Sequence, residues 1–84
     1  MPVISSFYGI NIKMYFQHSE HNPPHFHATY GNAEAEIEIR TGKILAGALP
    51  RKAEQMVRKW ANLHMDELLQ IWKTQTFIPL SPLE

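Results

Sequence analysis

Apolar and polar residues alternate along two stretches of the first half of the chain. In residues 10–17 the apolar positions Ile10, Ile12, Met14 and Phe16 alternate with Asn11, Lys13, Tyr15 and Gln17. The alternation is stricter in the segment EAEIEIR at residues 34–40, which has glutamates at one set of alternate positions and Ala35, Ile37 and Ile39 at the other. A period of two predicts half-buried β-strands in which one face packs on a core.

Two further short strands fit between turn signals. HFHATY at residues 25–30 precedes the pair Gly31-Asn32, which suits a tight hairpin. KILAG at residues 43–47 follows the turn at residues 41–43. Gly9 marks a bend or bulge in the first apolar stretch. The first half of the chain is therefore predicted to be an antiparallel meander.

A helical pattern replaces the alternation after Pro50. Residues 51–74 contain neither glycine nor proline, and their apolar residues recur at spacings of three and four. Such a helix of about 24 residues would be roughly 36 Å long, whereas strands of six or seven residues span ~20 to 23 Å. The helix must therefore bend, break near residues 62–66, or overhang onto another chain.

These elements predict a single α+β domain over residues 1–84, with a three- or four-stranded antiparallel meander packed on one long C-terminal helix. The sheet spans residues 3–48 and includes a histidine loop at 18–27. The helix spans residues 50–75. The tail at 76–84 contains two prolines and is expected to be extended.

Composition narrows the class of protein. The 84 residues include no cysteine, so neither disulfides nor thiolate metal ligands exist. Eight basic and eight acidic residues balance, which argues against broad nonspecific nucleic-acid binding. The first residues do not form a signal peptide and the apolar runs are too short to span a membrane, so we expect a cytoplasmic protein with no membrane partner. The thin core and overlong helix make a homodimer plausible.

The segment HSEHNPPHFHA at residues 18–28 holds four of the five histidines. His25 and His27 are two apart on a predicted strand and so project from the same face. His21 lies four residues earlier, across a loop stiffened by Pro23-Pro24. Three converging imidazoles are a common set of ligands for zinc or another divalent transition metal, and Glu20 or His18 would complete the set.

Two other interpretations of the histidines stay open. Without a metal, His21, His25 and His27 are candidate catalytic residues, in which a neutral and a protonated imidazole act as base and acid on an RNA phosphodiester. Alternatively, the histidines beside the prolines only seal a stiff turn. His64 lies on the apolar helix stripe, where it is either a core residue or a further partner of the cluster.

The start of the predicted helix is basic. Arg51 and Lys52 lie at an end that prefers negative charge, with Glu54 as the acid of the first turns. A bound phosphate or an acidic partner would compensate for this choice, because helix N-termini favour anions. We therefore take Arg51 and Lys52 as candidate phosphate-binding residues, with a solvated face as the alternative.

Four segments carry a resemblance to a known family: PVISSFYGINIKMYF, HNPPHFHATYG, RTGKILAGALPRKA and KWANLHMDELLQIW. Together they resemble the small bacterial "domain of unknown function" family numbered four-one-six-zero. The resemblance implies a small α+β protein, and members are often encoded beside another small domain in arrangements that look like toxin–antitoxin pairs. It implies no established activity and no known catalytic residues.

Two hypotheses about function follow. In the first, the chain is a component of a toxin–antitoxin-like module that acts on or binds RNA through its histidine cluster. In the second, it is a non-enzymatic interaction module that binds a cognate small protein encoded nearby, with the histidine loop structural or holding a divalent metal.

Overall fold

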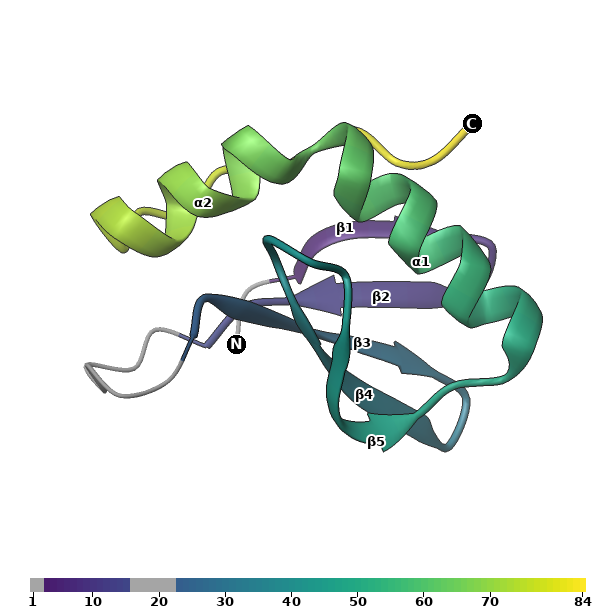
Figure 1. Cartoon of the computed structure of the whole chain (residues 1–84). Helices are drawn as coiled ribbons and strands as arrows, with labels where there is room; N and C mark the ends of the chain where they lie inside the picture. The colour runs from purple at the N-terminus through teal and green to yellow at the C-terminus, as the bar shows by residue number, and fades with distance from the viewer. Residues whose placement is uncertain (1–2, 16–22) are drawn as a thin grey trace.

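The fold is an antiparallel sheet covered on one face by two helices (Figure 1). The structure is a computed structural model that describes residues 3–15 and 23–84. Its strands are β1 (Val3–Phe7), β2 (Ile10–Lys13), β3 (His25–Tyr30), β4 (Ala33–Glu38) and β5 (Ile44–Ala48), and its helices are α1 (Arg51–Leu63) and α2 (Met65–Thr74). The strands lie side by side in chain order, and every neighbouring pair is antiparallel. The predicted α+β meander is confirmed.

The sheet has five strands, so the prediction of three or four was wrong. The difference arises at the N-terminal apolar stretch, which forms both β1 and β2. Tyr8 and Gly9 connect them, and both have positive φ angles, of 48° and 80°. Two consecutive residues in this region reverse the chain within a two-residue turn, which fits a hairpin better than a bend within one strand.

The prediction of one long helix was also wrong. Of the three alternatives for the overlong helical segment, the structure shows a break, which lies at His64. The φ of His64 is −113° and its ψ is 20°, outside the helical range, and α2 then begins with a new bond from the Leu68 N–H to the His64 carbonyl at 2.8 Å. The Cα atoms extend over 30 × 24 × 22 Å, so a straight helix of ~36 Å would project beyond the sheet. The break lets α1 and α2 each cover part of it. Neither helix is long and apolar enough to cross a membrane.

The core lies between the sheet and the helices. The helix-facing side of the strands supplies one set of alternate residues, and α1 and α2 supply Val57, Trp60, Leu68 and Ile71, all fully buried. The sheet contributes Ile4, Ile10, Ile12, Met14, Phe26, Ala28, Ala35, Ile37 and Ile39. The intervening residues therefore form the outer face of the sheet, and among them His25, the first residue of β3, also lies beside Trp72 of α2.

The segment after α2 returns along the sheet without forming a helix or a strand. The Leu80 N–H donates to the Ile4 carbonyl at 2.9 Å, which places the segment beside β1. The Trp60 indole N–H donates to the Ser81 carbonyl at 2.8 Å. These two bonds tie the segment to both layers and partly cover the β1 edge.

Candidate metal centre

The outer face of β3 presents His25 and His27, and the neighbouring strand presents glutamates to them. Glu36 lies directly across the ladder from His27, and Glu38 lies across from His25. Side chains opposite each other on antiparallel strands have Cβ atoms roughly 4.5–5.5 Å apart, so histidine and glutamate groups can meet. On the other side of β3, Lys13 of β2 pairs with His27.

Three potential ligand atoms converge on this face. The Nε2 atom of His27 is 3.4 Å from Oε1 of Glu36, and Nε2 of His25 is 3.8 Å from the same oxygen. One nitrogen or oxygen atom from each of the three residues lies within 4.8 Å of the other two. Ligands bound tetrahedrally at about 2.0–2.1 Å from a zinc ion are about 3.4 Å from one another. The spacing is thus close to that of a metal site.

The tautomer of His25 is set by a backbone contact. Its Nδ1 atom is 2.9 Å from the carbonyl oxygen of Pro23, and a carbonyl can only accept a hydrogen bond. Nδ1 therefore carries the proton, and in the neutral ring Nε2 has the free lone pair. Metal-bound histidines commonly donate their other N–H in this way, which fixes the orientation of the ring.

The ring of His25 is itself held from the helix side. Its centroid lies 5.1 Å from that of Trp72 in α2 and 5.4 Å from that of His27. His25 is buried, with 6% of its surface exposed. A buried ring held by an aromatic neighbour and a hydrogen bond has little freedom to turn, so Nε2 keeps its direction toward Glu36.

The surroundings of His27 favour its neutral form. Burial lowers its pKa below the ordinary value of 6.5, and this effect, with a smaller one from His25, outweighs the opposing attraction of Glu36 and Glu34. Its ring packs against Tyr15 with a centroid distance of 4.2 Å. The buried Nδ1 atom lacks a hydrogen-bond partner among the described residues and lies 3.6 Å from Oε1 of Glu34. A neutral His27 can offer a lone pair to a cation.

An open depression lies beside these groups on the outer face of β4 and β5. Its volume is about 290 Å³, and its lining includes His27, Glu34, Glu36, Ala46 and Gly47. The β5 residues that border it are small and leave the depression accessible from solvent. An ion held by His25, His27 and Glu36 would therefore keep a coordination position open to water or to a ligand.

The structure brings together only part of the predicted site. His25 and His27 share a face as expected, whereas His18, Glu20 and His21 lie outside the described residues. Glu36, which the sequence interpretation did not include, takes the place beside the two histidines. Its position across the hairpin from His27 was the signal that could have identified it.

His64 lies in a different place. It occupies the break between α1 and α2, where its Nδ1 atom is 2.6 Å from Oε1 of Glu67 and its ring centroid is 5.0 Å from that of Trp60. It is half-buried and bonded on the helix layer, whereas His25 and His27 belong to the outer face of the sheet. His64 is therefore not a fourth member of the cluster.

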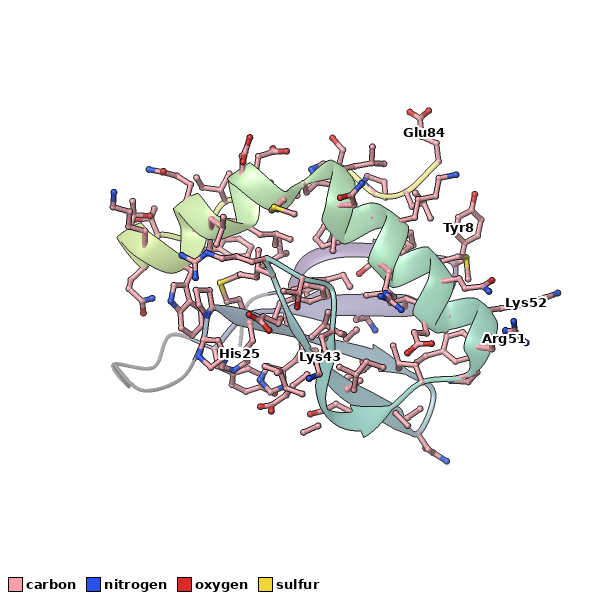
Figure 2. The ribbon with its side chains drawn as sticks, viewed as in Figure 1. Tyr8, His25, Lys43, Arg51, Lys52 and Glu84 are labelled. Atoms are coloured by element: carbon pink, nitrogen blue, oxygen red, sulfur yellow. The ribbon has the colours of Figure 1, made fainter. Side chains whose placement is uncertain are left out.

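Arg51 and Lys52 are also remote from the histidines. Figure 2 shows both at the start of α1, at the opposite end of the molecule from His25. A phosphate bound by these two residues would not reach the imidazoles. The two candidate groups therefore do not form one site.

Comparison with known proteins identifies the family. The family model described as Domain of unknown function (DUF4160) matches residues 9–73, most of the chain, so the protein belongs to this family. The match includes β2 to β5, α1 and most of α2, and thus all three residues of the candidate metal centre. No curated protein and no solved structure matches the chain.

Proposed function

We propose that this member of the DUF4160 family is a metal-binding module, in which His25, His27 and Glu36 hold a divalent transition metal ion such as zinc. The observation that carries the proposal is the convergence of three ligand atoms within 4.8 Å on the outer face of the sheet. The residues lie on two adjacent strands, so their spacing is fixed by the ladder rather than by a loop.

The charges around the histidines favour a cation over an anion. Glu34, Glu36 and Glu38 all project from the outer face of β4, while the pKa of His27 is lowered. At neutral pH the surroundings of His27 are therefore predominantly negative. A phosphate would be repelled by these carboxylates, whereas a bound divalent cation would offset their mutual repulsion.

The ligand types favour a transition metal over calcium or magnesium. Two imidazole nitrogens and one carboxylate oxygen are borderline ligands that suit zinc and its neighbours, whereas calcium and magnesium prefer sites made of oxygen. Three protein ligands with an open position are typical of zinc sites that carry out chemistry. Such an ion lowers the pKa of a bound water to about 7 and so supplies hydroxide for hydrolysis.

This proposal changes the form of the RNA hypothesis. Metal-free cleavage by two histidines would require a phosphate to approach three glutamates, with Lys13 of β2 as the basic residue paired with His27 and with Arg51 and Lys52 too distant to assist. A role in a toxin–antitoxin-like pair that acts on RNA is better supported in a metal-loaded form, because the ion would offset most of the negative charge of the three glutamates. RNA cleavage is then expected to depend on the metal and to stop when a chelator removes it.

The experiment is a zinc titration of untagged protein followed by elemental analysis. We expect one ion per chain in the natural protein, and loss of binding in the double variant His25→Ala, His27→Ala. The control is His64→Ala, which removes one imidazole outside the cluster and should keep the ion. Circular dichroism checks that each variant is folded. A folded double variant that still binds one ion per chain would refute the site.

An interaction role is the second candidate, and the β5 edge favours it. Among the described residues β5 pairs only with β4, and its sequence ILAGA has no charge and no proline to discourage another strand. Leu45 on this strand is 40% exposed. An edge of this kind can accept a strand from a cognate small protein through backbone hydrogen bonds.

This second role predicts a complex with a cognate small protein encoded nearby, and it is tested by co-expression of the two. Leu45→Lys places a charge on the exposed edge and should abolish the complex while leaving zinc binding unchanged. Tyr8→Lys is the control, because Tyr8 is 61% exposed in the β1–β2 turn at a distance from β5 along the sheet. Equal loss in both variants would point to a partner surface other than β5.

A further inference from the structure

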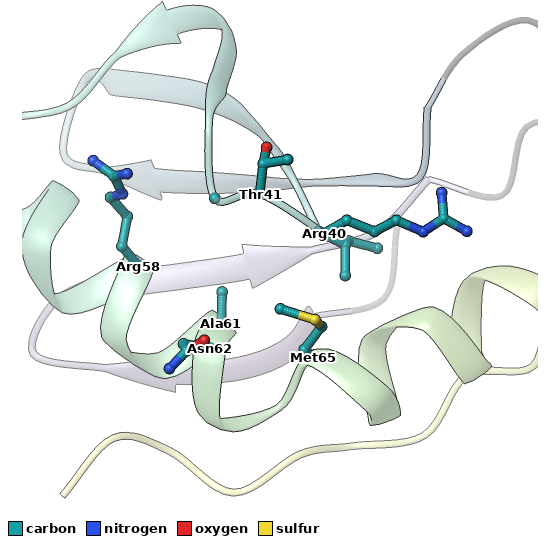
Figure 3. A pocket seen from close by; sticks show the side chains of 8 residues that line it. Arg40, Thr41, Arg58, Ala61, Asn62 and Met65 are labelled. Atoms are coloured by element: carbon teal, nitrogen blue, oxygen red, sulfur yellow. The ribbon is translucent and has the colours of Figure 1, made fainter.

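A second polar cavity lies on the helix side of the molecule, between the β4–β5 turn and the junction of α1 and α2 (Figure 3). Its volume is about 240 Å³. Thr41 and Gly42 border it from the turn, and Arg58, Ala61, Asn62 and Met65 border it from the helices. This cavity is formed by different elements from the candidate metal centre on the outer face of the sheet.

The cavity combines positive charge with a partly apolar lining. Arg58 and Arg40 stand at its two sides, and no acidic residue belongs to its lining. Ala61 and Met65 contribute apolar surface between them. An apolar wall reduces the local dielectric, so a charge-assisted hydrogen bond made there is stronger than one made in open solvent.

The donors at this cavity are free within the part of the chain that the structure describes. Neither arginine has a carboxylate within 4.0 Å among those residues. The side chains of Arg40, Arg58 and Asn62 also make none of the side-chain hydrogen bonds found there. An incoming anion would therefore not have to break an existing ion pair.

Thr41 differs from these donors because its hydroxyl is already engaged. It donates to the Glu38 carboxylate at 3.1 Å and accepts from the Lys43 N–H at 3.2 Å. The Gly42 N–H donates to the Glu38 carbonyl at 2.9 Å. These bonds hold the turn in place. Because the Arg40 guanidinium points away from the cavity (Figure 3), the Arg58 guanidinium and the Asn62 amide are the groups available to a ligand.

We propose that this cavity binds a phosphate group through Arg58, with the Asn62 amide as a further donor. A guanidinium presents a planar set of N–H groups that matches phosphate oxygens in a bidentate manner. The volume of about 240 Å³ is below the ~300 to 1,000 Å³ of pockets that enclose a drug-sized ligand. The cavity thus fits a terminal phosphate, supplied by a free monoester or by the end of an RNA strand.

The position of Arg58 gives the turn a specific role in this site. A Cβ built on Gly42 would lie 3.6 Å from the Nε atom of Arg58, so the guanidinium end of the arginine lies over the glycine. Gly42 has a φ of +73°, which favours glycine. A tight turn and the arginine above it thereby form one side of the cavity.

The test is a titration of ¹⁵N-labelled protein with inorganic phosphate at constant ionic strength, after EDTA treatment so that no metal contributes. We expect saturable amide shifts at Thr41, Gly42 and Asn62. Arg58→Gln should weaken binding by about tenfold or more, as expected for loss of a charge-assisted bond. Lys59→Gln is the matched control, since it removes one positive charge from the neighbouring position of the same helix, outside the cavity, and should leave the affinity unchanged.

Shifts spread over all basic residues, or equal weakening by Lys59→Gln and Arg58→Gln, would overturn the proposal. Asn62→Ala is the second variant and keeps the test decisive if Arg58→Gln does not fold. Titration with a short RNA, with and without a 5′-phosphate, identifies the source. Tighter binding of the phosphorylated strand that is lost in Arg58→Gln supports an RNA end. Equal binding of both strands, with phosphate still bound at the cavity, supports a small monoester.

Discussion

His27 lies directly across the β3–β4 ladder from Glu36, and its Nε2 atom is 3.4 Å from the Glu36 carboxylate. The backbone hydrogen bonds of the ladder set this relationship, so the two side chains are held together before any ligand arrives. His25 approaches the same oxygen from two residues away on β3. A site prepared in this way binds an ion with little loss of conformational freedom.

The first prediction concerns the carboxylate. Glu36→Gln removes the charged ligand and should weaken zinc binding by at least about tenfold. Mutation of groups that only orient metal ligands already costs about 10- to 100-fold in metal affinity. Glu38→Gln removes the same charge from the same strand face without removing a ligand, and should have a smaller effect. Isothermal titration calorimetry measures both. Equal losses would show that general negative charge, rather than coordination, attracts the ion.

The second prediction concerns the pH dependence of stability in the metal-free protein. Because burial lowers the pKa of His27 below 6.5 in the folded state, the unfolded chain takes up a proton first as the pH falls below about 6.5. The free energy of unfolding should therefore be at its maximum above this pH. It should decrease as the pH falls further, until His27 is also protonated in the folded protein. Urea unfolding should show a shallower decline for His27→Gln. If the free energy of unfolding of His27→Gln falls with pH as steeply as that of the natural protein, other titrating groups cause the decrease.

The third prediction concerns Gly47 in β5. It has a φ of +75°, and an added Cβ would lie 2.1 Å from the backbone oxygen of Glu34. Gly47→Ala should therefore combine conformational strain with a backbone clash and destabilise the fold by more than the ~1 to 3 kcal/mol of such strain alone. Gly31→Ala is the control, since its φ is +58° and nothing lies within 4 Å. Equal melting temperatures for the two variants would contradict the clash.

The fourth prediction concerns the link between α1 and the C-terminal segment. Trp60 is fully buried and donates to the Ser81 carbonyl at 2.8 Å. Trp60→Phe should cost about 1 kcal/mol for the bond and a further ~1 to 3 kcal/mol for lost packing. Ser81→Ala keeps the carbonyl and should be nearly neutral in chemical denaturation. A large loss in Ser81→Ala would show that its side chain, not its carbonyl, holds the segment.

Much of the sheet could be predicted because its alternation is strict. In residues 34–40 the glutamates and the aliphatic residues separate cleanly, and β4 has its glutamates on the outer face as that pattern indicated. The pairing register was also accessible. A two-residue loop at Gly31-Asn32 pairs Tyr30 with Ala33, and counting back from this pair aligns His27 with Glu36. Glu36 could therefore have been predicted as a ligand from the local hairpin register, although it lies outside the histidine-rich segment.

The parts that could not be predicted from the sequence depend on contacts between distant segments. A break near residues 62–66 was one of three outcomes expected for the helical segment, but no proline or glycine marks it, since Leu63, His64 and Met65 are ordinary helical residues. The break allows both helices to pack on the sheet, and this tertiary packing cannot be predicted from local helix propensity. The cavity beside Arg58 likewise requires a turn and a helix junction that are far apart in the chain.

The order of the strands has a consequence for how the molecule folds. Because each strand pairs with the next one along the chain, the sheet is built from short-range contacts, which favours fast folding. The meander can thus form from successive hairpins while later parts of the chain are still being synthesised. The bond between Ile4 and Leu80 joins two segments that are distant in the sequence, and it cannot form until residue 80 has been synthesised. Assembly therefore proceeds from local hairpins to a final long-range closure.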